Sequence, residues 1–327
     1  MRIIIKRKKK VKAEEKPPPQ KNNTKTKKDK KPKKVAPKKE KKNKILHNPS
    51  KRKYNSKDLS NFSIIIPFRH TKLRERLLYK VLEFLRKNFD PEIIIAEHDY
   101  KQNINKSDIE KKFNVKYFFI KAEKDELFDR TGCLNFLIQK TSTQVVFNHD
   151  SDCILDPSCY LLAKDLILAN KYDVVIPYCG EGFNVSENFE MNGSDKNILY
   201  LRWECARGGI IAIDREKYIK AGMENPKIKS WGFEDFERIY RFSKLRYRIC
   251  ATKLPEVSHF SEKFFKKKYL YHFDHDSDRD ENSNKNPHIE SNEKISNKIR
   301  SMSRASLQKE IDSWLGKNKP EAQFKFK

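Results

Sequence analysis

QVVFNHDSD, residues 144–152, is the stretch that decides the fold class of this chain. Its first half is a short apolar run, which is typical of a strand buried on both faces of a parallel sheet. The run ends in Asp150 and Asp152, and side chains two positions apart on a strand point the same way. Open α/β sheets bind ligands at the carboxyl edge of such strands. We therefore expect a buried strand that presents two carboxylates at a ligand-binding edge.

The segments on both sides of this stretch alternate between strand and helix patterns. FSIIIPF, residues 62–68, is followed by leucines at helical spacing. Further strand candidates are 92–98, 115–122, 172–178, the segments ILYLRWE and GGIIAID, and a strand near 246–250. Helix candidates are 105–113, 131–141, 157–168, 215–221 and 234–244, with a short terminal helix in SMSRASLQKEIDSWLGK. Alternating βα units predict an α/β fold with a mostly parallel central sheet flanked by helices.

The first 58 residues differ in composition from the rest of the 327-residue chain. They contain 25 Lys and Arg against 5 Asp and Glu, which is +20 of the formal charge of +27. Because they lack apolar periodicity, they cannot bury enough surface to offset chain entropy, and we expect a disordered lysine-rich tail. Such a tail suits a solvated tether or a localisation signal, and it can also contact nucleic acid or an anionic surface. We expect a catalytic domain at 59–278 and a polar C-terminal extension with a short helix at 279–327.

Compartment and redox state follow from what the sequence lacks. No apolar run reaches the roughly 20 residues of a membrane span, and MRIIIKRKKK has too few apolar residues for a signal peptide. We therefore expect a cytosol-like compartment, unless the tail directs the protein elsewhere. The 6 cysteines show no CxxC pairing, so we expect buried reduced thiols and no cysteine zinc site.

A second acidic pair, Glu234-Asp235, stands in WGFED (231–235) at the start of a helix candidate. One interpretation is structural, because carboxylates in the first turn complement the helix dipole and can cap the helix. The other makes one carboxylate the general base for an acceptor hydroxyl, with Trp231 offering a flat apolar face to a sugar ring. The pairing with an upstream DxD favours the second interpretation.

Two further motifs suit the same chemistry. The carboxylates of Asp150 and Asp152 are hard oxygen donors that suit Mg²⁺ or Mn²⁺ bridging a diphosphate. His272 and His275 are three positions apart and can meet one metal ion, although solvated loop histidines show the same spacing. The adjacent glycines before IIAID, at 208–209, permit a turn or the close approach of a ligand to the backbone.

In this order, the motifs resemble the β-1,4-galactosyltransferase-like family (family 7) of inverting GT-A glycosyltransferases. A looser similarity extends to the chondroitin and polypeptide N-acetylgalactosaminyl transferases. The matching segments are IIIPFR (64–69), FDRTGCLN (128–135), VVFNHDSDCIL (145–155), GGIIAIDREKYIKAGM (208–223) and WGFED (231–235). The resemblance implies a single GT-A domain, a UDP-sugar donor, Mn²⁺ or Mg²⁺ as cofactor, and a glycan, glycolipid or glycoprotein acceptor.

The resemblance also implies a role for each matched residue. Asp235 corresponds to the catalytic base and Glu234 to its neighbour at the sugars, while Asp152, His272 and His275 are the implied metal ligands. The sequence alone leaves open which of His272, His275 and His259 binds the metal. The residues implied to hold the nucleotide sugar are Arg69, Phe128, Arg130, Asp150, Gly208, Gly209 and Trp231. Phe236 departs from the family, because it stands where the acidic string continues with another aspartate.

Two other functions stay open at this point. In a two-metal nuclease or phosphatase, Asp150, Asp152, Glu234 and Asp235 would hold a metal pair. In a nucleic-acid-binding protein, the lysine-rich tail would bind and the globular part would be a degenerate transferase. The nuclease or phosphatase needs a basic groove within the folded part, and the 269 residues after the tail carry only +7.

Overall fold

The computed structural model of the chain describes residues 61–191, 193, 195–252, 254, 262–275 and 286–315. The chain divides into two units, Met1–Asn48 and Pro49–Lys327, and all of these residues belong to the second unit. The lysine-rich tail at 1–58 and His259 lie outside the described residues.

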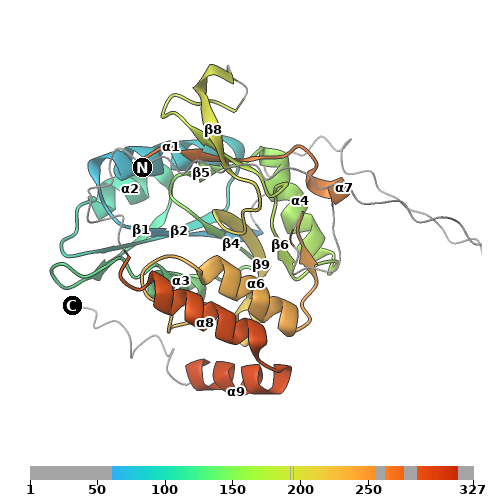
Figure 1. Ribbon diagram of the computed structural model, residues 1–327. Helices are drawn as coiled ribbons and strands as arrows, with labels where there is room; N and C mark the ends of the chain where they lie inside the picture. Colours follow the sequence, from blue (N-terminus) through green and yellow to red (C-terminus); the bar gives the residue numbers. More distant parts are fainter. Residues whose placement is uncertain are drawn as a thin grey trace, which may run out of the picture. The chain divides into compact units, whose positions relative to one another are not determined.

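A seven-stranded central sheet organises the second unit (Figure 1). Its strands lie in the order β10-β6-β9-β4-β1-β2-β3. Their bounds are β1 Phe62–Phe68, β2 Glu92–Asp99, β3 Lys116–Lys121, β4 Val145–His149, β6 Val174–Val175, β9 Ile210–Asp214 and β10 Ile249–Cys250. All neighbouring strands are parallel except β9, which runs antiparallel to β4 and β6. The predicted α/β class with a mostly parallel sheet is confirmed, although the strand expected at 172–178 shrinks to two residues.

A second, four-stranded sheet has the order β5-β11-β7-β8. Its strands are β5 Cys153–Ile154, β7 Gly182–Val185, β8 Ile198–Trp203 and β11 Leu270–Phe273. β5 starts directly after Asp152 and pairs antiparallel with β11. This pairing joins the centre of the fold to the last strand of the chain.

The helices lie against both faces of the central sheet. Their bounds are α1 Lys72–Asn88, α2 Lys106–Phe113, α3 Arg130–Lys140, α4 Pro157–Leu168, α5 Arg215–Lys220, α6 Glu234–Lys244, α7 Glu262–Phe265, α8 Ile289–Ser301 and α9 Arg304–Leu315, with a 3₁₀ turn at Asp195–Asn197. In Figure 1, α1 lies on one side of the sheet, and α3, α6 and α8 lie on the other. None of the helices described combines the length and the hydropathy needed to cross a lipid bilayer.

Local sequence explains where these helices begin. The side chain of Thr71 caps α1 by accepting a hydrogen bond from the Arg74 amide at 3.1 Å, and that of Asn105 caps α2 in the same way. Side-chain oxygens at this position satisfy amide groups that have no partner within the helix. Leu77, Leu78, Leu82 and Leu85 of α1 are buried and Leu73 is partly buried, in line with their helical spacing.

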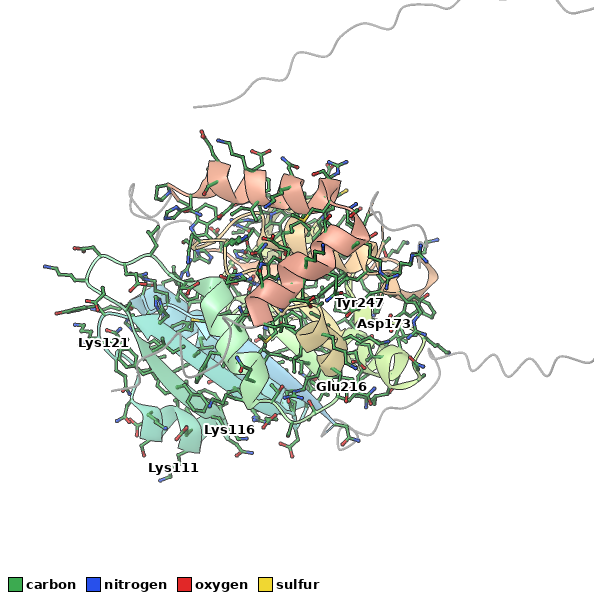
Figure 2. The ribbon with its side chains drawn as sticks, turned by 90° about the horizontal axis from the view of Figure 1, so that it is seen from below. Lys111, Lys116, Lys121, Asp173, Glu216 and Tyr247 are labelled. Atoms are coloured by element: carbon green, nitrogen blue, oxygen red, sulfur yellow. The ribbon has the colours of Figure 1, made fainter. Side chains whose placement is uncertain are left out.

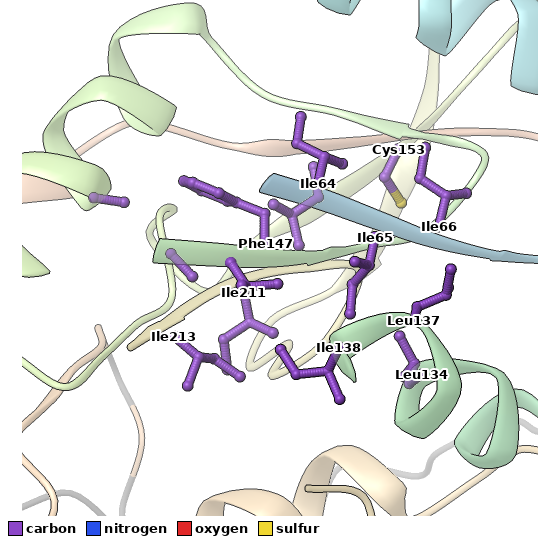
Figure 3. Packing of buried hydrophobic residues seen from close by; sticks show 14 of the residues in the cluster. Ile64, Ile65, Ile66, Leu134, Leu137, Ile138, Phe147, Cys153, Ile211 and Ile213 are labelled. Atoms are coloured by element: carbon purple, nitrogen blue, oxygen red, sulfur yellow. The ribbon is translucent and has the colours of Figure 1, made fainter. Parts of the chain in front are cut away.

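The core lies between the central sheet and its helices (Figure 3). Ile65 of β1, Phe147 of β4 and Ile211 of β9 are all buried, and so is Leu137 of α3. Because β1 is covered on both faces, its side chains are buried along the whole strand. Burial of one such aliphatic side chain contributes about 1.5–3 kcal/mol.

The outer edge of the sheet is protected by charge. β3 is the last strand on one side, and Figure 2 shows Lys116 and Lys121 at its two ends. Both lysines are exposed, and the ammonium of Lys116 contacts Glu92 at 2.7 Å. Lysines on an edge strand disfavour pairing with a further strand, so this edge is kept from aggregation.

The C-terminal helices pack onto the domain. In α9, Leu307, Ile311 and Trp314 are buried, as expected for the apolar side of the predicted terminal helix. Any side chain at Gly222 would bring its Cβ to 2.9 Å from the Trp314 ring. α8 lies beside α6 and was not expected, because its sequence is polar.

Candidate active site

The structure brings one carboxylate and two histidines together at the carboxyl end of β4. The Nε2 atom of His275 lies 3.1 Å from Asp152 Oδ2, and that of His272 lies 3.6 Å from Asp152 Oδ1. All three side chains are buried, and their potential ligand atoms lie within 4.8 Å of one another. An oxygen and two imidazole nitrogens at this spacing can hold one divalent cation.

Strand pairing produces this cluster from distant parts of the sequence. In the antiparallel pair β5·β11, His272 lies opposite Cys153, the residue after Asp152. The amide of Phe273 donates to the Asp152 carbonyl at 2.8 Å, which continues the pairing to the aspartate itself. His275 follows two residues after the strand ends. The register of two short strands therefore fixes which residues meet.

A second-layer amide orients His272, whereas the buried Nδ1 atom of His275 has no hydrogen-bond partner among the described residues. The Nδ1 atom of His272 lies 3.0 Å from the Oδ1 atom of Asn184 on β7, which accepts a hydrogen bond only if that nitrogen carries the proton. The Nε2 lone pair is then left for a metal ion. Burial alone would raise the pKa of Asp152, but His272 and His275 outweigh it and hold the pKa well below its usual range. The carboxyl group of Asp152 is therefore ionised at neutral pH.

Arg130, at the start of α3, connects the two acidic motifs. Its Nη2 atom donates to Asp150 at 2.5 Å, and its Nη1 atom lies 3.5 Å from Glu234 Oε1. Burial alone would lower the pKa of Arg130. The negative charges of Asp150 and Glu234 outweigh this effect, so the pKa lies above its usual value. The guanidinium therefore stays charged between the DxD motif and the first turn of α6.

The carboxylate of Asp235 accepts a hydrogen bond from a buried arginine that is itself paired with a glutamate. Arg238 donates from Nη1 to Asp235 Oδ1 at 2.7 Å, and from Nε and Nη2 to Glu224 at 2.7 and 2.9 Å. Arg238 and Glu224 are almost fully buried, whereas the side chain of Asp235 is 27% exposed. A bidentate guanidinium–carboxylate pair has a fixed geometry, so it fixes the orientation of Asp235.

The glycine pair lies directly against this carboxylate. A Cβ atom at Gly208 would lie 1.9 Å from Asp235 Oδ2, so no other residue fits there without moving the carboxylate. Gly209 has φ +78°, and its carbonyl accepts from the Asp150 amide at 2.8 Å. The two glycines thus bring the DxD motif and the acid at 235 close to one another.

One cleft of about 250 Å³ joins these groups. Asp150 and His272 line it together with Asp235 and the two glycines. The rest of the wall consists of Cys153, Trp203, Cys205, Ala206, Arg207, Phe236 and Leu270. The two acidic motifs, more than 80 positions apart in the sequence, therefore share a single cavity.

Seven predicted residues lie outside this wall. Four of them make the contacts described above, namely Arg130, Asp152, Glu234 and His275. The other three are Arg69, Phe128 and Trp231. Arg69 donates from Nη1 to the Glu126 carbonyl at 2.6 Å, which ties the loop after β1 to the segment before α3. Phe128 lies in that segment, with its ring centre 6.2 Å from that of His98. The side chain of Trp231 is exposed. Arg69 and Phe128 lie near the carboxyl ends of β1 and β2, where the resemblance expects the nucleotide.

For several residues of the site, no sequence motif predicted that they belong to it. Asn184, Glu224 and Arg238 stand in segments without a recognisable motif, and only the fold shows what they contact. Phe236 was noted only as a departure, yet it lines the cleft, and the guanidinium of Arg207 lies 4.2 Å from its ring centre.

Glu234 predicts a pH dependence of stability. Burial and the charge of Asp235 raise the pKa of Glu234 to about 7, against the opposing charge of Arg130. Between the unfolded value near 4.5 and 7, the native state binds a proton that the unfolded state has lost, so stability falls as the pH rises through this window. In the wild type, the free energy of unfolding should fall by on the order of 3 kcal/mol over this pH window, at about 1.4 kcal/mol per pKa unit. We expect Glu234→Gln to remove this fall. Urea unfolding of both proteins at pH 4.5 and 7.5 measures the difference, and parallel changes in the two would contradict it.

Comparisons with known proteins show what parts of the chain are similar to. Residues 191–275 match the family described as the N-terminal domain of galactosyltransferase. The chain has no match among curated protein sequences. Among solved structures, GalNAc-T7 with UDP, GalNAc and Mn²⁺ is similar at 17% identity and a TM-score of 0.44, over 66% of this chain and 44% of that one.

Two structures of Drosophila β1,4-galactosyltransferase 7 are also similar, each at 13% identity. The catalytic domain with xylobiose has a TM-score of 0.39 over 76% of this chain and 84% of that one. A mutant with manganese, UDP-Gal and xylobiose has a TM-score of 0.34 over 61% and 67%. The chain spans less than half the length of the GalNAc-T7 chain. The matched residues 191–275 include His272 and His275 of the candidate metal cluster, so over this segment the chain is similar to the galactosyltransferase family.

Proposed function

We propose that this chain is a metal-dependent inverting glycosyltransferase that moves a hexose or N-acetylhexosamine from a UDP-sugar to a hydroxyl group of a glycan or glycoconjugate. The observation that carries the proposal is the shared cleft, in which Asp150 and His272 lie on one side and Asp235 on another. A donor diphosphate and an acceptor hydroxyl can therefore occupy one cavity. Reacting groups held together in this way gain rate through proximity and orientation.

The residues of the cluster fit a divalent cation. Two Nε2 atoms aim at one carboxylate, and the buried Nδ1 atom of His272 is matched with an amide oxygen, so the ring of His272 can offer its Nε2 lone pair. Mixed nitrogen and oxygen donors suit Mn²⁺, and Mg²⁺ prefers a larger share of oxygen. A bound ion of this kind supplies Lewis-acid stabilisation of the negative charge on a departing diphosphate.

Residues of the chain accept the acceptor proton and position the reacting groups. Arg238 holds one oxygen of Asp235, and the other oxygen faces the glycine pair at the cleft, where it can accept the proton of an acceptor hydroxyl. The deprotonated oxygen attacks the anomeric carbon from the face opposite the leaving UDP, which inverts the configuration. Arg130 holds Asp150 at the donor side, so that the carboxylate keeps its place when the nucleotide enters.

The same geometry counts against a two-metal nuclease. Glu234 and Asp150 both contact Arg130, so a guanidinium already lies where a second cation would have to bind. Among the described residues, the groups that could hold a metal ion include Asp150 and Asp152 but neither Glu234 nor Asp235. The carboxylates of α6 are therefore better placed for proton transfer than for metal binding.

A donor screen tests the proposal without knowledge of the acceptor. The purified chain is incubated with Mn²⁺ or Mg²⁺ and each UDP-sugar in turn, and the release of UDP is measured. We start with UDP-Gal and UDP-GalNAc because the matched family is a galactosyltransferase family. Metal-dependent release from at least one UDP-sugar is expected. If none of them is hydrolysed with either metal, while the fold is intact, the proposed function is wrong.

Asn184 gives a further prediction about the metal site. Its amide orients His272, and loss of such a second-layer contact lowers metal affinity about 10–100-fold in other sites. We expect Asn184→Ala to weaken Mn²⁺ binding by this factor while the protein stays folded. Titration of Mn²⁺ by calorimetry measures it. Ser186→Ala, two residues further along, is the control, and equal affinities for the two variants would contradict the orienting role.

A further inference from the structure

The segment 229–233, here called the Trp231 loop, has a backbone that its own sequence does not stabilise. Ser230 and Phe233 have φ of +59° and +68°, and Gly232 has φ +98°. Positive φ is unfavourable for residues other than glycine and persists only where the surroundings enforce it. Phe233 is also the N-cap of α6 and gives no side-chain cap. Something outside the loop must therefore hold it.

Helix α8 provides these contacts. Asn292 is fully buried, and its Nδ2 atom lies 2.8 Å from the carbonyl of Lys229, 3.2 Å from that of Gly232 and 3.3 Å from that of Trp231. Its Oδ1 atom accepts from the Lys229 amide at 3.0 Å. One amide side chain thus contacts the backbone of three of the five loop residues, Lys229, Trp231 and Gly232.

Two neighbours of Asn292 strengthen the contact. Asn286, which is also buried, donates from Nδ2 to the Trp231 carbonyl. Any side chain at Gly232 would place its Cβ 2.3 Å from the Cδ1 atom of Ile289. Glycine at 232 therefore suits both the positive φ of this position and the close approach of α8.

The consequence for the site follows from the chain connection. The Trp231 loop leads directly into Glu234 and Asp235, the first residues of α6. A loop that moved would displace the start of this helix, and with it the carboxylate at the cleft. α8 also lies along α6, with the Arg300 guanidinium 5.3 Å from the Tyr240 ring centre.

We propose that Asn292, assisted by Asn286, is a positioning residue: it fixes the Trp231 loop through its backbone and so places Asp235 for the reaction. This role rests on the proposed function, and it makes α8 a part of the catalytic unit rather than of a polar extension. Asn292 touches neither the cleft nor the metal cluster. Its loss therefore lowers the rate of transfer and leaves donor binding intact.

Hydrogen exchange on the full chain tests the contact without any need for activity. In Asn292→Ala, the amide of Lys229 loses its acceptor, and we expect peptides covering 226–233 to exchange at least tenfold faster than in the wild type. Ser296→Ala is the matched control, because Ser296 is buried one turn further along α8 and its hydroxyl has no hydrogen-bond partner among the described residues. Unchanged exchange in Asn292→Ala overturns the proposal. If this variant does not fold, Asn286→Ala takes its place under the same criterion.

Kinetics test the positioning role. We expect kcat for transfer to fall at least tenfold in Asn292→Ala, with KM for the UDP-sugar unchanged and wild-type values in Ser296→Ala. Faster exchange with an unchanged kcat would show that the loop is held but that its position does not matter, and the proposal would fail. If the wild type transfers no sugar, the proposed function fails, while the exchange comparison still decides whether α8 holds the loop.

Discussion

Replacement of Asp235 by Asn is expected to lower sugar transfer by a factor of about 10²–10⁴, the usual contribution of a general base. The amide has nearly the shape of the carboxylate, and its oxygen can still accept from Arg238, so the cleft keeps its form. The change removes the group that takes the acceptor proton. Transfer rates at saturating donor and Mn²⁺ measure the effect.

The control for this variant separates chemistry from folding. Glu216→Gln removes the same charge from α5, where the carboxylate is 77% exposed and contacts only Lys220 at 3.6 Å among the interactions described. We expect full activity in this control, and an unchanged affinity of Asp235→Asn for UDP and Mn²⁺. Near-normal transfer by Asp235→Asn would show that another group accepts the proton.

Replacement of Asp152 by Ala is expected to abolish metal-dependent transfer, with a loss of about 10³-fold or more. Among the described residues, Asp152 is the carboxylate that contacts both histidines, so without it the remaining nitrogens bind Mn²⁺ weakly. A thousandfold loss corresponds to about 4 kcal/mol of transition-state stabilisation, which is within the range of charge stabilisation by a metal ion. Transfer and UDP release are measured over a series of Mn²⁺ concentrations.

A binding measurement completes this test. Ligand that binds the native state raises the melting temperature, and wild-type protein should therefore melt higher with Mn²⁺ and UDP. We expect no such rise in Asp152→Ala, and a normal rise in Asp165→Ala, which removes a partly exposed carboxylate from α4. A normal rise in Asp152→Ala would place the metal elsewhere.

The sequence predicted the parts of the fold that depend on local pattern. β1 and β4 are continuous apolar runs and α1 has a regular apolar face, so their places could be predicted. The DxD motif and the acidic pair were found for the same reason, because each stands at the end of such an element. The meeting of Asp152 with His272 depended on strand pairing over more than 100 positions, which no local pattern encodes.

The C-terminal part shows the limit of this reasoning. The sequence of α8 is polar, and its buried residues are Asn292, Ser296 and Ile299, so it gives no apolar stripe to recognise. Its place is decided by hydrogen bonds from asparagine side chains to a strained loop that is more than 50 positions away. The buried pair of Glu224 and Arg238 was missed for the same reason, since two charged residues in a sequence usually indicate surface.

Calorimetric titration of the full chain with UDP, with and without Mn²⁺, tests the central claim most directly. That claim is that the cluster of Asp152, His272 and His275 holds a divalent cation against the diphosphate in the cleft beside Asp235. The account predicts that UDP binds in the presence of Mn²⁺ and binds at least tenfold more weakly when the metal is removed by a chelator. Equal binding of UDP with and without the metal, or no binding under either condition, would contradict it.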